Sequence, residues 1–265
     1  MPELDQETIR KAVLENYTEV AQRGGGGCGP EAPGGVGCCG GGTVSISNQI
    51  GYSEDELAGV PEGSDMGLGC GNPQAIAALK PGETVLDLGS GGGFDCFLAA
   101  CQVGEAGRVI GVDMTPEMIR KARANARTGG YANVEFRLGE IEHLPVADRS
   151  VDAIISNCVI NLSPDKPAVF RDAFRVLKPG GRLAIADIVA TAAIPEDARK
   201  DLALISGCVG GAAPIDEIET YLREAGFRDI RIQPKDSSRE FIREWAPGRR
   251  AEDYVISATI EAVKP

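Results

Sequence analysis

Long hydrophobic runs and clusters of basic residues are both missing from this sequence of 265 residues. The best candidate for a membrane span, residues 183–194, is shorter than the roughly 18 apolar residues that a spanning helix needs, and Asp187 interrupts it. The first residues lack the basic start and apolar core of a signal peptide. Basic residues number 27 against 39 acidic ones, whereas nucleic-acid binding requires concentrated positive charge. We therefore expect a cytoplasmic protein that binds neither membranes nor nucleic acids.

Histidine and closely paired cysteines are equally scarce. His143 is the only histidine, and no two of the eight cysteines have the Cys-x-x-Cys spacing that is typical of zinc and thioredoxin-type sites. We expect His143 on the surface or in a loop. Because the cytosol keeps thiols reduced, a disulfide framework is not expected either. Metal or metalloid binding and redox chemistry remain as uses for the cysteines.

From residue 81 onward, short apolar and β-branched runs alternate with stretches of helical periodicity. This order predicts an α/β fold, with a doubly wound, mostly parallel, seven-stranded sheet and helices on both of its faces. A turn at residues 179–181 should lead into the fifth strand. The predicted strands are residues 84–88, 108–112, 133–137, 151–156, 182–189, 227–233 and 254–261, and the predicted helices are residues 7–22, 94–101, 116–127, 166–177, 215–225 and 239–245.

The N-terminal part has a different composition. Residues 24–43 contain 11 glycines together with Cys28, Cys38 and Cys39. So much glycine cannot form a stable helix or strand, because glycine loses the most backbone entropy on ordering. We therefore divide the chain into residues 1–72, an N-terminal helix with a Gly/Cys-rich arm, and residues 73–265, the α/β domain, whose elements around residues 195–215 should contribute to the functional site.

Residues 85–93, Val-Leu-Asp-Leu-Gly-Ser-Gly-Gly-Gly, are the most informative stretch. A strand that runs into glycines permits a tight turn and a close approach of the backbone to a ligand at the start of the next helix. The third glycine has the wrong spacing for dinucleotide binding. The stretch instead resembles motif I of the class I S-adenosylmethionine-dependent methyltransferases, which have a Rossmann-like fold. Asp113 at the end of the second strand and residues 178–181 before the fifth are also typical of this superfamily.

This resemblance implies that S-adenosylmethionine is the cofactor. Asp113 has the position of the carboxylate that binds both ribose hydroxyls in the superfamily, and residues 139–142 have that of the adenine contacts. Tyr17, in the first predicted helix, is either a packing residue or a cover for the cofactor. The cofactor-binding residues that the resemblance implies are Asp87, Gly89, Ser90, Gly91, Asp113, Met114, Glu140, Ile141, Glu142 and Asn157.

Three cysteines occur in segments where an acceptor site is expected. Ligands of open parallel sheets bind beyond the carboxyl ends of the strands, so Cys158, just after the fourth strand, should face the reactive methyl group. Its position alone is equally consistent with packing, since free cysteine is often buried. Cys70 and Cys208 are flanked by glycines and are expected in loops, and Cys70 precedes a helix capped by Asn72, whose N-terminus favours a thiolate. Three thiolates together would form a soft site for a thiophilic ion.

The other cysteines have simpler interpretations. Cys96 and Cys101 are five residues apart on one predicted helix, and about 140° of rotation separates them, so they are not expected to chelate an ion together. We expect both to pack in the core or between the helix and the sheet. Cys28 would be a spare thiol in the glycine-rich segment.

Four segments are similar to the arsenite methyltransferase family, and the similarity extends over about residues 40–235. It implies methyl transfer from S-adenosylmethionine to trivalent arsenic, for arsenic detoxification. By position, Cys70, Cys158 and Cys208 would be the arsenic-binding thiolates, and Cys38 or Cys39 the additional thiol that exchanges disulfides with Cys70. The family also implies a thiol reductant, glutathione or thioredoxin, and we expect a monomer. The four segments are residues 69–73, 139–145, 156–166 and 207–212.

Two other functions remain open from the residues alone. A methyltransferase of a small organic acceptor, such as a quinone precursor or a sterol, would have a large apolar acceptor pocket. It would also remain active when Cys158 is replaced by serine. A non-catalytic protein that binds thiophilic ions would bind arsenite without any affinity for S-adenosylmethionine, and the intact Asp87, glycine turn and Asp113 disfavour it.

Overall fold

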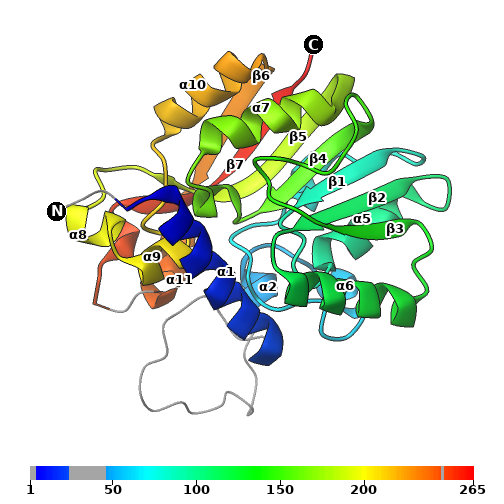
Figure 1. The fold of residues 1–265 in the computed structure, drawn as a ribbon, viewed down its shortest axis with the longest axis horizontal. Helices are drawn as coiled ribbons and strands as arrows, with labels where there is room; N and C mark the ends of the chain where they lie inside the picture. Colours follow the sequence, from blue (N-terminus) through cyan, green and yellow to red (C-terminus); the bar gives the residue numbers. More distant parts are fainter. Residues whose placement is uncertain (1–3, 24–45, 246–247) are drawn as a thin grey trace.

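A central sheet organises the computed structural model, which describes residues 4–23, 46–245 and 248–265. Its strand order within these residues is β3-β2-β1-β4-β5-β7-β6 (Figure 1). Strands β1 to β5 pair in parallel, whereas β7 is antiparallel to both of its neighbours. The prediction of a doubly wound, mostly parallel, seven-stranded sheet is thus confirmed. The strands are β1 (Thr84–Leu88), β2 (Arg108–Asp113), β3 (Val134–Leu138), β4 (Val151–Asn157), β5 (Leu177–Ala190), β6 (Arg228–Lys235) and β7 (Val255–Val263).

Successive side chains of a strand point to opposite faces of the sheet. Helices pack against the apolar side chains on both of these faces. Val85 and Val109 pack with α5 and α6 on one face. Leu86 and Ile110 pack with α7 and α10 on the other. Both faces of the central strands are therefore apolar, which explains their nearly continuous hydrophobic sequences. The helices concerned are α5 (Phe94–Val103), α6 (Pro116–Gly129), α7 (Lys166–Val176) and α10 (Ile215–Ala225).

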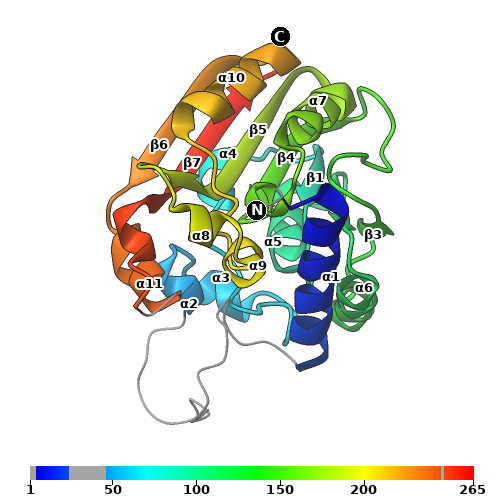
Figure 2. The ribbon, with the colours of Figure 1, turned by 60° about the vertical axis from the view of Figure 1, so that its left-hand side comes forward.

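The N-terminal helix α1 (Gln6–Arg23) packs against α6 and α9, and Figure 2 shows it alongside α6. No helix in the described part of the chain is long and apolar enough to cross a lipid bilayer. The shorter helices are α2 (Ile46–Gln49), α3 (Glu54–Ala58), α4 (Gln74–Ala77), η1 (Ile160–Leu162), α8 (Glu196–Arg199), α9 (Leu202–Ser206), α11 (Ser238–Trp245) and η2 (Ala251–Asp253).

Strand β5 begins earlier than the sequence predicted. The predicted turn at residues 179–181 is present as an irregularity, where the pairing of β5 with β4 shifts its register. Gly180 has a φ of 78° there, which glycine adopts without a steric penalty. The N–H of Gly180 donates to the carbonyl of Lys264, and the N–H of Lys264 donates to the carbonyl of Gly181, both at 2.8 Å. These bonds to the last residues of the chain keep the turn within the sheet.

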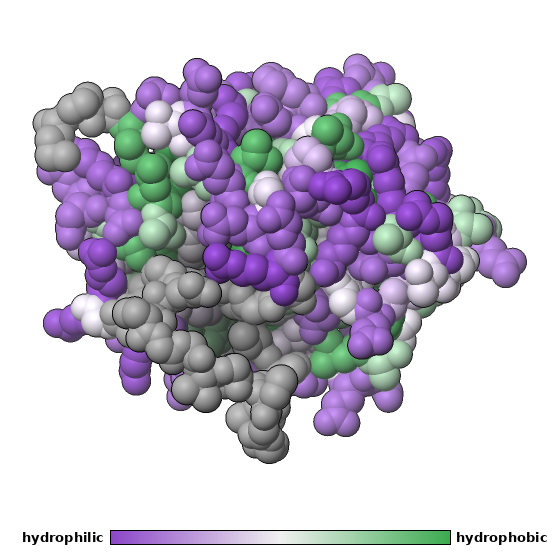
Figure 3. Space-filling view, turned by 60° about the horizontal axis from the view of Figure 1, so that its bottom comes forward, coloured by the Kyte–Doolittle hydropathy of each residue, from purple (hydrophilic) through white to green (hydrophobic). Residues whose placement is uncertain are grey.

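The surface of the molecule carries mostly polar residues, whereas the core is apolar. The face in Figure 3 is mostly hydrophilic, with hydrophobic residues in patches between the polar ones. Among the described residues, Leu138 is the one large hydrophobic side chain that is exposed. The apolar side chains are instead collected in clusters on the two faces of the sheet. A further apolar cluster includes Ile188 and Ala190, at the carboxyl end of β5.

Candidate functional site

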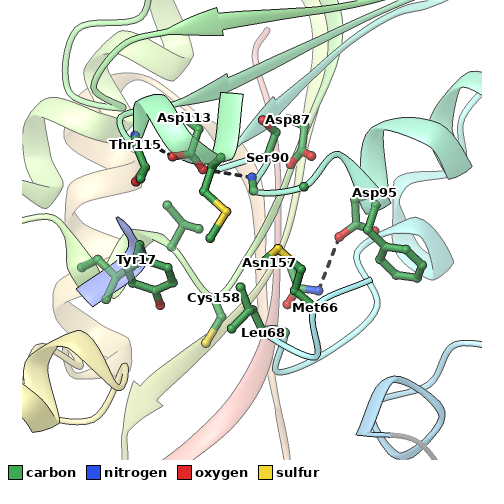
Figure 4. A pocket seen from close by; sticks show the side chains of 18 of the residues that line it. Tyr17, Met66, Leu68, Asp87, Ser90, Asp95, Asp113, Thr115, Asn157 and Cys158 are labelled. Carbon is green, nitrogen blue, oxygen red and sulfur yellow. Dashed lines mark hydrogen bonds between the residues drawn. The ribbon is translucent and has the colours of Figure 1, made fainter. Parts of the chain in front are cut away.

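A pocket lies at the carboxyl ends of β1, β2 and β4, where an open parallel sheet binds its ligands (Figure 4). Asp87 comes from β1, Ser90 from the turn that follows it, and Asp113 from β2. Asn157 ends β4, and Cys158 follows directly. The pocket therefore gathers residues predicted to bind the cofactor together with one predicted to bind the acceptor.

The turn between β1 and α5 requires glycine at its first position. Gly89 has a φ of +69°, and a Cβ atom there would lie 2.3 Å from Cγ2 of Val159. The N–H groups of Gly89 and Ser90 donate to the carbonyl of Val112, which fastens the turn to β2. The Ser90 hydroxyl is buried and has no hydrogen-bond partner within the described residues. Since buried hydroxyls normally have a partner, this atom points to a ligand in the pocket.

The carboxyl groups of Asp87, Asp95 and Asp113 line the pocket. Burial raises the pKa of Asp87, Asp95 and Asp113, that of Asp95 to about 6, and no basic side chain is among the groups that shift these values. Asp113 accepts hydrogen bonds from the N–H groups of Gly91 at 2.9 Å and Thr115 at 2.8 Å. Buried carboxylates without a basic partner favour a cationic ligand. S-adenosylmethionine, with its sulfonium and ammonium groups, fits this pocket.

One of the residues predicted to bind the cofactor, Glu140, does not line the pocket. The chain turns back after it, with the N–H of His143 3.2 Å from its carbonyl oxygen. Its side chain is 44% exposed and pairs with Arg10, at 3.8 Å between Oε2 and Nε. Glu142 faces inward and accepts a 2.5 Å hydrogen bond from Ser163 Oγ. His143 is exposed, as predicted. The predicted cofactor residues that line the pocket are Asp87, Gly89, Ser90, Gly91, Asp113, Met114, Ile141, Glu142 and Asn157.

Helix α1 closes one side of the pocket. Arg10, Val13 and Tyr17 all line it, and their spacing places them on one face of the helix. The Tyr17 hydroxyl also donates to the carbonyl of Ser206 at 3.4 Å. Tyr17 therefore lies at the cofactor pocket, one of the two positions considered for it. Arg10 and Val13 also line the pocket, although the sequence analysis placed them only within a predicted helix.

Cys70, Cys158 and Cys208 come together at the edge of the pocket. The Sγ atoms of Cys70 and Cys158 and a carboxylate oxygen of Asp187 all lie within 4.8 Å of one another. The Cys208 thiol donates to the main-chain carbonyl of Cys158 at 3.2 Å. All three thiols are free, and none of the three residues is more than 3% exposed. Three separate loops thus deliver their cysteines to one place, which we call the thiol cluster.

The thiol cluster is set in an apolar environment that includes Ile188 and Val209. The cysteines are loop residues, as predicted, yet they are as buried as core residues. Cys158 and Cys208 have φ values of 58° and 62°, a conformation that side chains other than glycine rarely adopt. Such strain persists where the surroundings enforce it, and it is concentrated at functional sites.

The expectation that a helix N-terminus favours the Cys70 thiolate is wrong. The helix that follows, α4, has only four residues, although Asn72 Oδ1 does accept from the N–H of Ala75 at 3.3 Å. Burial outweighs this effect and raises the pKa of the Cys70 thiol. Contacts with the thiols of Cys208 and Cys70, followed by burial, raise the pKa of Cys158 as well. The thiols of Cys70 and Cys158 are therefore protonated at neutral pH.

Asp187 is a neighbour of the thiols that the sequence pattern did not assign to a site. Its carboxylate is 1% exposed and accepts hydrogen bonds from the N–H groups of Ile160 at 2.8 Å and Ile188 at 2.7 Å. Burial raises its pKa to about 6. The sequence does contain an indication of this role, because Asp187 interrupts an apolar run. A carboxylate inside the apolar run of a central strand is costly to bury without a partner or a role.

The remaining cysteines divide between the core and the surface. Cys96 is fully buried and donates to Asp87 Oδ2 at 3.2 Å, in agreement with its predicted packing role. The same prediction is wrong for Cys101, which is exposed and lies 4.0 Å from the Tyr131 hydroxyl. The rotation of about 140° between the two positions turns Cys101 away from the sheet. The predictions for three cysteines lie outside the described residues: Cys28, Cys38 and Cys39.

Comparisons with known proteins find methyltransferases that are similar to this chain. A family model described as a methyltransferase domain matches residues 79–226. The chain is 55% identical, over 98% of its length, to the arsenite methyltransferase of Halobacterium salinarum and covers 68% of that protein. It is 47% identical over 179 residues to the arsenite methyltransferase of Aquipseudomonas alcaligenes, covering 51% of it. A crystal structure of an arsenic(III) S-adenosylmethionine methyltransferase from Chlamydomonas reinhardtii superimposes with a TM-score of 0.62 and 31% identity, over 85% of this chain and 75% of that one.

Proposed function

This chain belongs to the arsenite methyltransferase family, and we propose that it transfers a methyl group from S-adenosylmethionine to trivalent arsenic held by Cys70, Cys158 and Cys208. The observation that carries this proposal is the meeting of the three thiols at the edge of a pocket that fits the cofactor. Cys158 belongs to both, because it lines the pocket and forms part of the thiol cluster. The product would be methylated arsenic, and the role would be arsenic detoxification.

Three thiols provide the soft donor set that trivalent arsenic prefers. Arsenous acid carries three hydroxyl groups, so each arsenic–sulfur bond that forms replaces an arsenic–oxygen bond. The thiol proton then leaves with the hydroxide as water, and no net charge is created in the apolar thiol cluster. The raised pKa values of Cys70 and Cys158 are consistent with this exchange, because they keep the thiols neutral before it. Arsenic with three sulfur ligands retains a lone pair, which makes it the nucleophile.

Separate groups of the pocket would hold different parts of S-adenosylmethionine. Asp113 would accept the ribose hydroxyls, Ile141 and Glu142 would face the adenine, and Asp87 and Asp95 would offset the cationic charge. When bound, the cofactor supplies an electrophilic methyl group on its sulfonium. Methyl transfer to a lone pair moves no proton. The contribution of the chain is therefore to position the arsenic and to exclude water from it.

Turnover also requires two electrons, because arsenic that has donated its lone pair to a methyl group is formally pentavalent. We propose that two thiols supply these electrons and become a disulfide. The family resemblance implies Cys70 with Cys38 or Cys39 as this pair, and an external thiol such as glutathione or thioredoxin would then reduce the disulfide. A cytoplasmic monomer and a domain boundary at residue 72 stay predictions.

The test of the proposed function is an anaerobic incubation with arsenite, S-adenosylmethionine and a thiol, followed by separation and quantification of the arsenic species. We expect methylated arsenic from the wild type. Cys158→Ser should lower its rate of formation by about 100-fold or more, since loss of a group that merely orients a metal ligand already lowers activity about 10- to 100-fold. Cys101→Ser is the matched control, because the Cys101 thiol is exposed on α5 and should not matter.

Two outcomes would contradict the proposal. Cys158→Ser with the same activity as Cys101→Ser would show that the thiol cluster does not hold the acceptor. A wild type that binds S-adenosylmethionine but leaves arsenite unmethylated would favour a small organic acceptor, and the cysteines would then be packing residues.

A further inference from the structure

The Asn157 side chain holds the main chain on both sides of the Cys70 thiol. Its Oδ1 atom accepts a hydrogen bond from the N–H of Cys70 at 3.0 Å, and its Nδ2 atom donates to the carbonyl of Gly71 at 2.7 Å. Asn157 is also the last residue of β4 and precedes Cys158. Asn157 therefore links the segment that carries Cys70 to the segment that carries Cys158.

The same amide reaches into the cofactor pocket, and Figure 4 shows it pointing toward Asp95. Its Nδ2 atom donates to the Tyr52 hydroxyl oxygen at 3.0 Å and lies 3.5 Å from Asp95 Oδ2. The Tyr52 hydroxyl donates in turn to Asp95 Oδ1 at 2.8 Å. Tyr52 and Asp95 are buried, and both line the pocket. A continuous chain of hydrogen bonds thus leads from Asp95 through Tyr52 and Asn157 to Cys70.

The chemistry of these partners permits one orientation of the amide. The carbonyl of Gly71 and the carboxylate of Asp95 can only accept, whereas the N–H of Cys70 can only donate. The NH₂ group must therefore face Gly71 and Asp95, and the oxygen must face Cys70. The fit is also close, because a Cβ atom on Gly69 would lie 2.6 Å from Asn157 Nδ2. The segment that carries Cys70 consequently lies directly against this amide.

We propose that Asn157 is a positioning residue that holds the Cys70 thiol at the arsenic and makes the binding of arsenite and of the cofactor cooperative. The inference rests on the proposed function and deepens it. A ligand that packs against Tyr52 and Asp95 restrains the Asn157 amide, and with it the main chain at Cys70. Arsenic bound to Cys70 restrains the same amide from the other side. By thermodynamic linkage, each ligand then increases the affinity for the other by the same factor.

Three variants separate this role from a general contribution to stability. Asn157→Ala removes the whole set of hydrogen bonds. Asn157→Asp keeps the shape but turns an oxygen toward the acceptors of Gly71 and Asp95, so it should not rescue the alanine variant. Tyr52→Phe removes only the hydroxyl that joins Asn157 to the pocket. Asn133→Ala is the matched control, because its amide also binds two main-chain carbonyls, at 3.0 and 3.4 Å, but at the amino end of β3.

Two measurements report the expected effects. Arsenic X-ray absorption counts the sulfur ligands, and equilibrium dialysis gives the arsenite affinity with and without S-adenosylhomocysteine, the unreactive product. The wild type should show three sulfur ligands and bind arsenite about five-fold or more tightly when S-adenosylhomocysteine is present. Asn157→Ala should lose one sulfur ligand, bind arsenite about ten-fold or more weakly and show no enhancement. Tyr52→Phe should lose most of the enhancement, while Asn133→Ala should match the wild type.

Failure of this inference is distinguishable from failure of the proposed function. Three sulfur ligands and a full enhancement in Asn157→Ala would exclude the positioning role and leave the arsenic site intact. Fewer than three sulfur ligands in the wild type would instead refute the three-thiol site itself. If Asn157→Ala does not fold, Tyr52→Phe decides, because an undiminished enhancement in that variant excludes the proposed coupling.

Discussion

At the scale of single residues, Gly89 determines how closely the turn after β1 approaches the loop after β4. It lies in the turn after β1, and the Val159 side chain occupies the space where a Cβ atom of residue 89 would be. Val159 directly follows Cys158 on the loop after β4. The missing side chain therefore lets the cofactor turn and a thiol-bearing loop pack against each other. A methyl group at this position would push against both.

We expect Gly89→Ala to destabilise the protein by about 3 kcal/mol or more, because it combines a positive φ with overpacking. It should also weaken the binding of S-adenosylhomocysteine. Gly82→Ala is the matched control: its φ is +85°, but its Cβ atom would meet nothing within 4 Å, so its cost should stay at about 1 to 2 kcal/mol. Urea unfolding gives the free energies and calorimetric titration the affinities. Equal losses in both variants would show that the Val159 contact is unimportant.

At the scale of elements, α1 shows which part of an arrangement local sequence can predict. The helical spacing of its apolar residues predicted the helix at residues 7–22, close to its observed extent of Gln6–Arg23. The surface that it covers depends on partners distant in the chain. Tyr17 reaches Ser206, 189 residues away, and Thr18 Oγ1 lies 3.5 Å from a carboxylate oxygen of Glu117, 99 residues away. No local pattern indicates such pairs.

Tyr17→Ala should raise the KM for S-adenosylmethionine about ten-fold, since an aromatic side chain that lines the pocket contributes roughly 1.5 to 3 kcal/mol when it is buried. The kcat should change little, because the ring borders the pocket and is not part of the thiol cluster. Glu15→Ala, an exposed position on the same helix, should leave both constants unchanged. Steady-state methylation at saturating arsenite measures them. A lower kcat with an unchanged KM would mean that α1 acts on the thiols through Ser206 instead.

At the scale of the whole molecule, topology explains why sequence indicated the site but not its properties. Asp87 lies near the carboxyl end of β1, and Cys158 directly follows β4, its parallel neighbour, so the alternation of strands and helices was enough to bring them together. The protonation of Cys70 depends on its burial in an apolar cluster that distant loops assemble. Asp187 was visible only as an interruption of an apolar run, because its hydrogen bonds and its nearness to the thiols arise from the folded chain.

The reduction step proposed above assigns a role in turnover to Cys38 or Cys39 of the glycine-rich segment, which lies outside the described residues. The double variant Cys38→Ser with Cys39→Ser should bind arsenite and complete a first methyl transfer like the wild type, since all three cluster thiols remain. Its multiple turnover should slow by about ten-fold or more at a low concentration of external thiol, because a tethered thiol acts at a far higher effective concentration. Cys28→Ser, in the same segment, is the matched control. Rapid-quench single turnovers and steady-state arsenic speciation separate the two phases. If multiple turnover is unchanged, the electrons reach the arsenic from the external thiol without these cysteines.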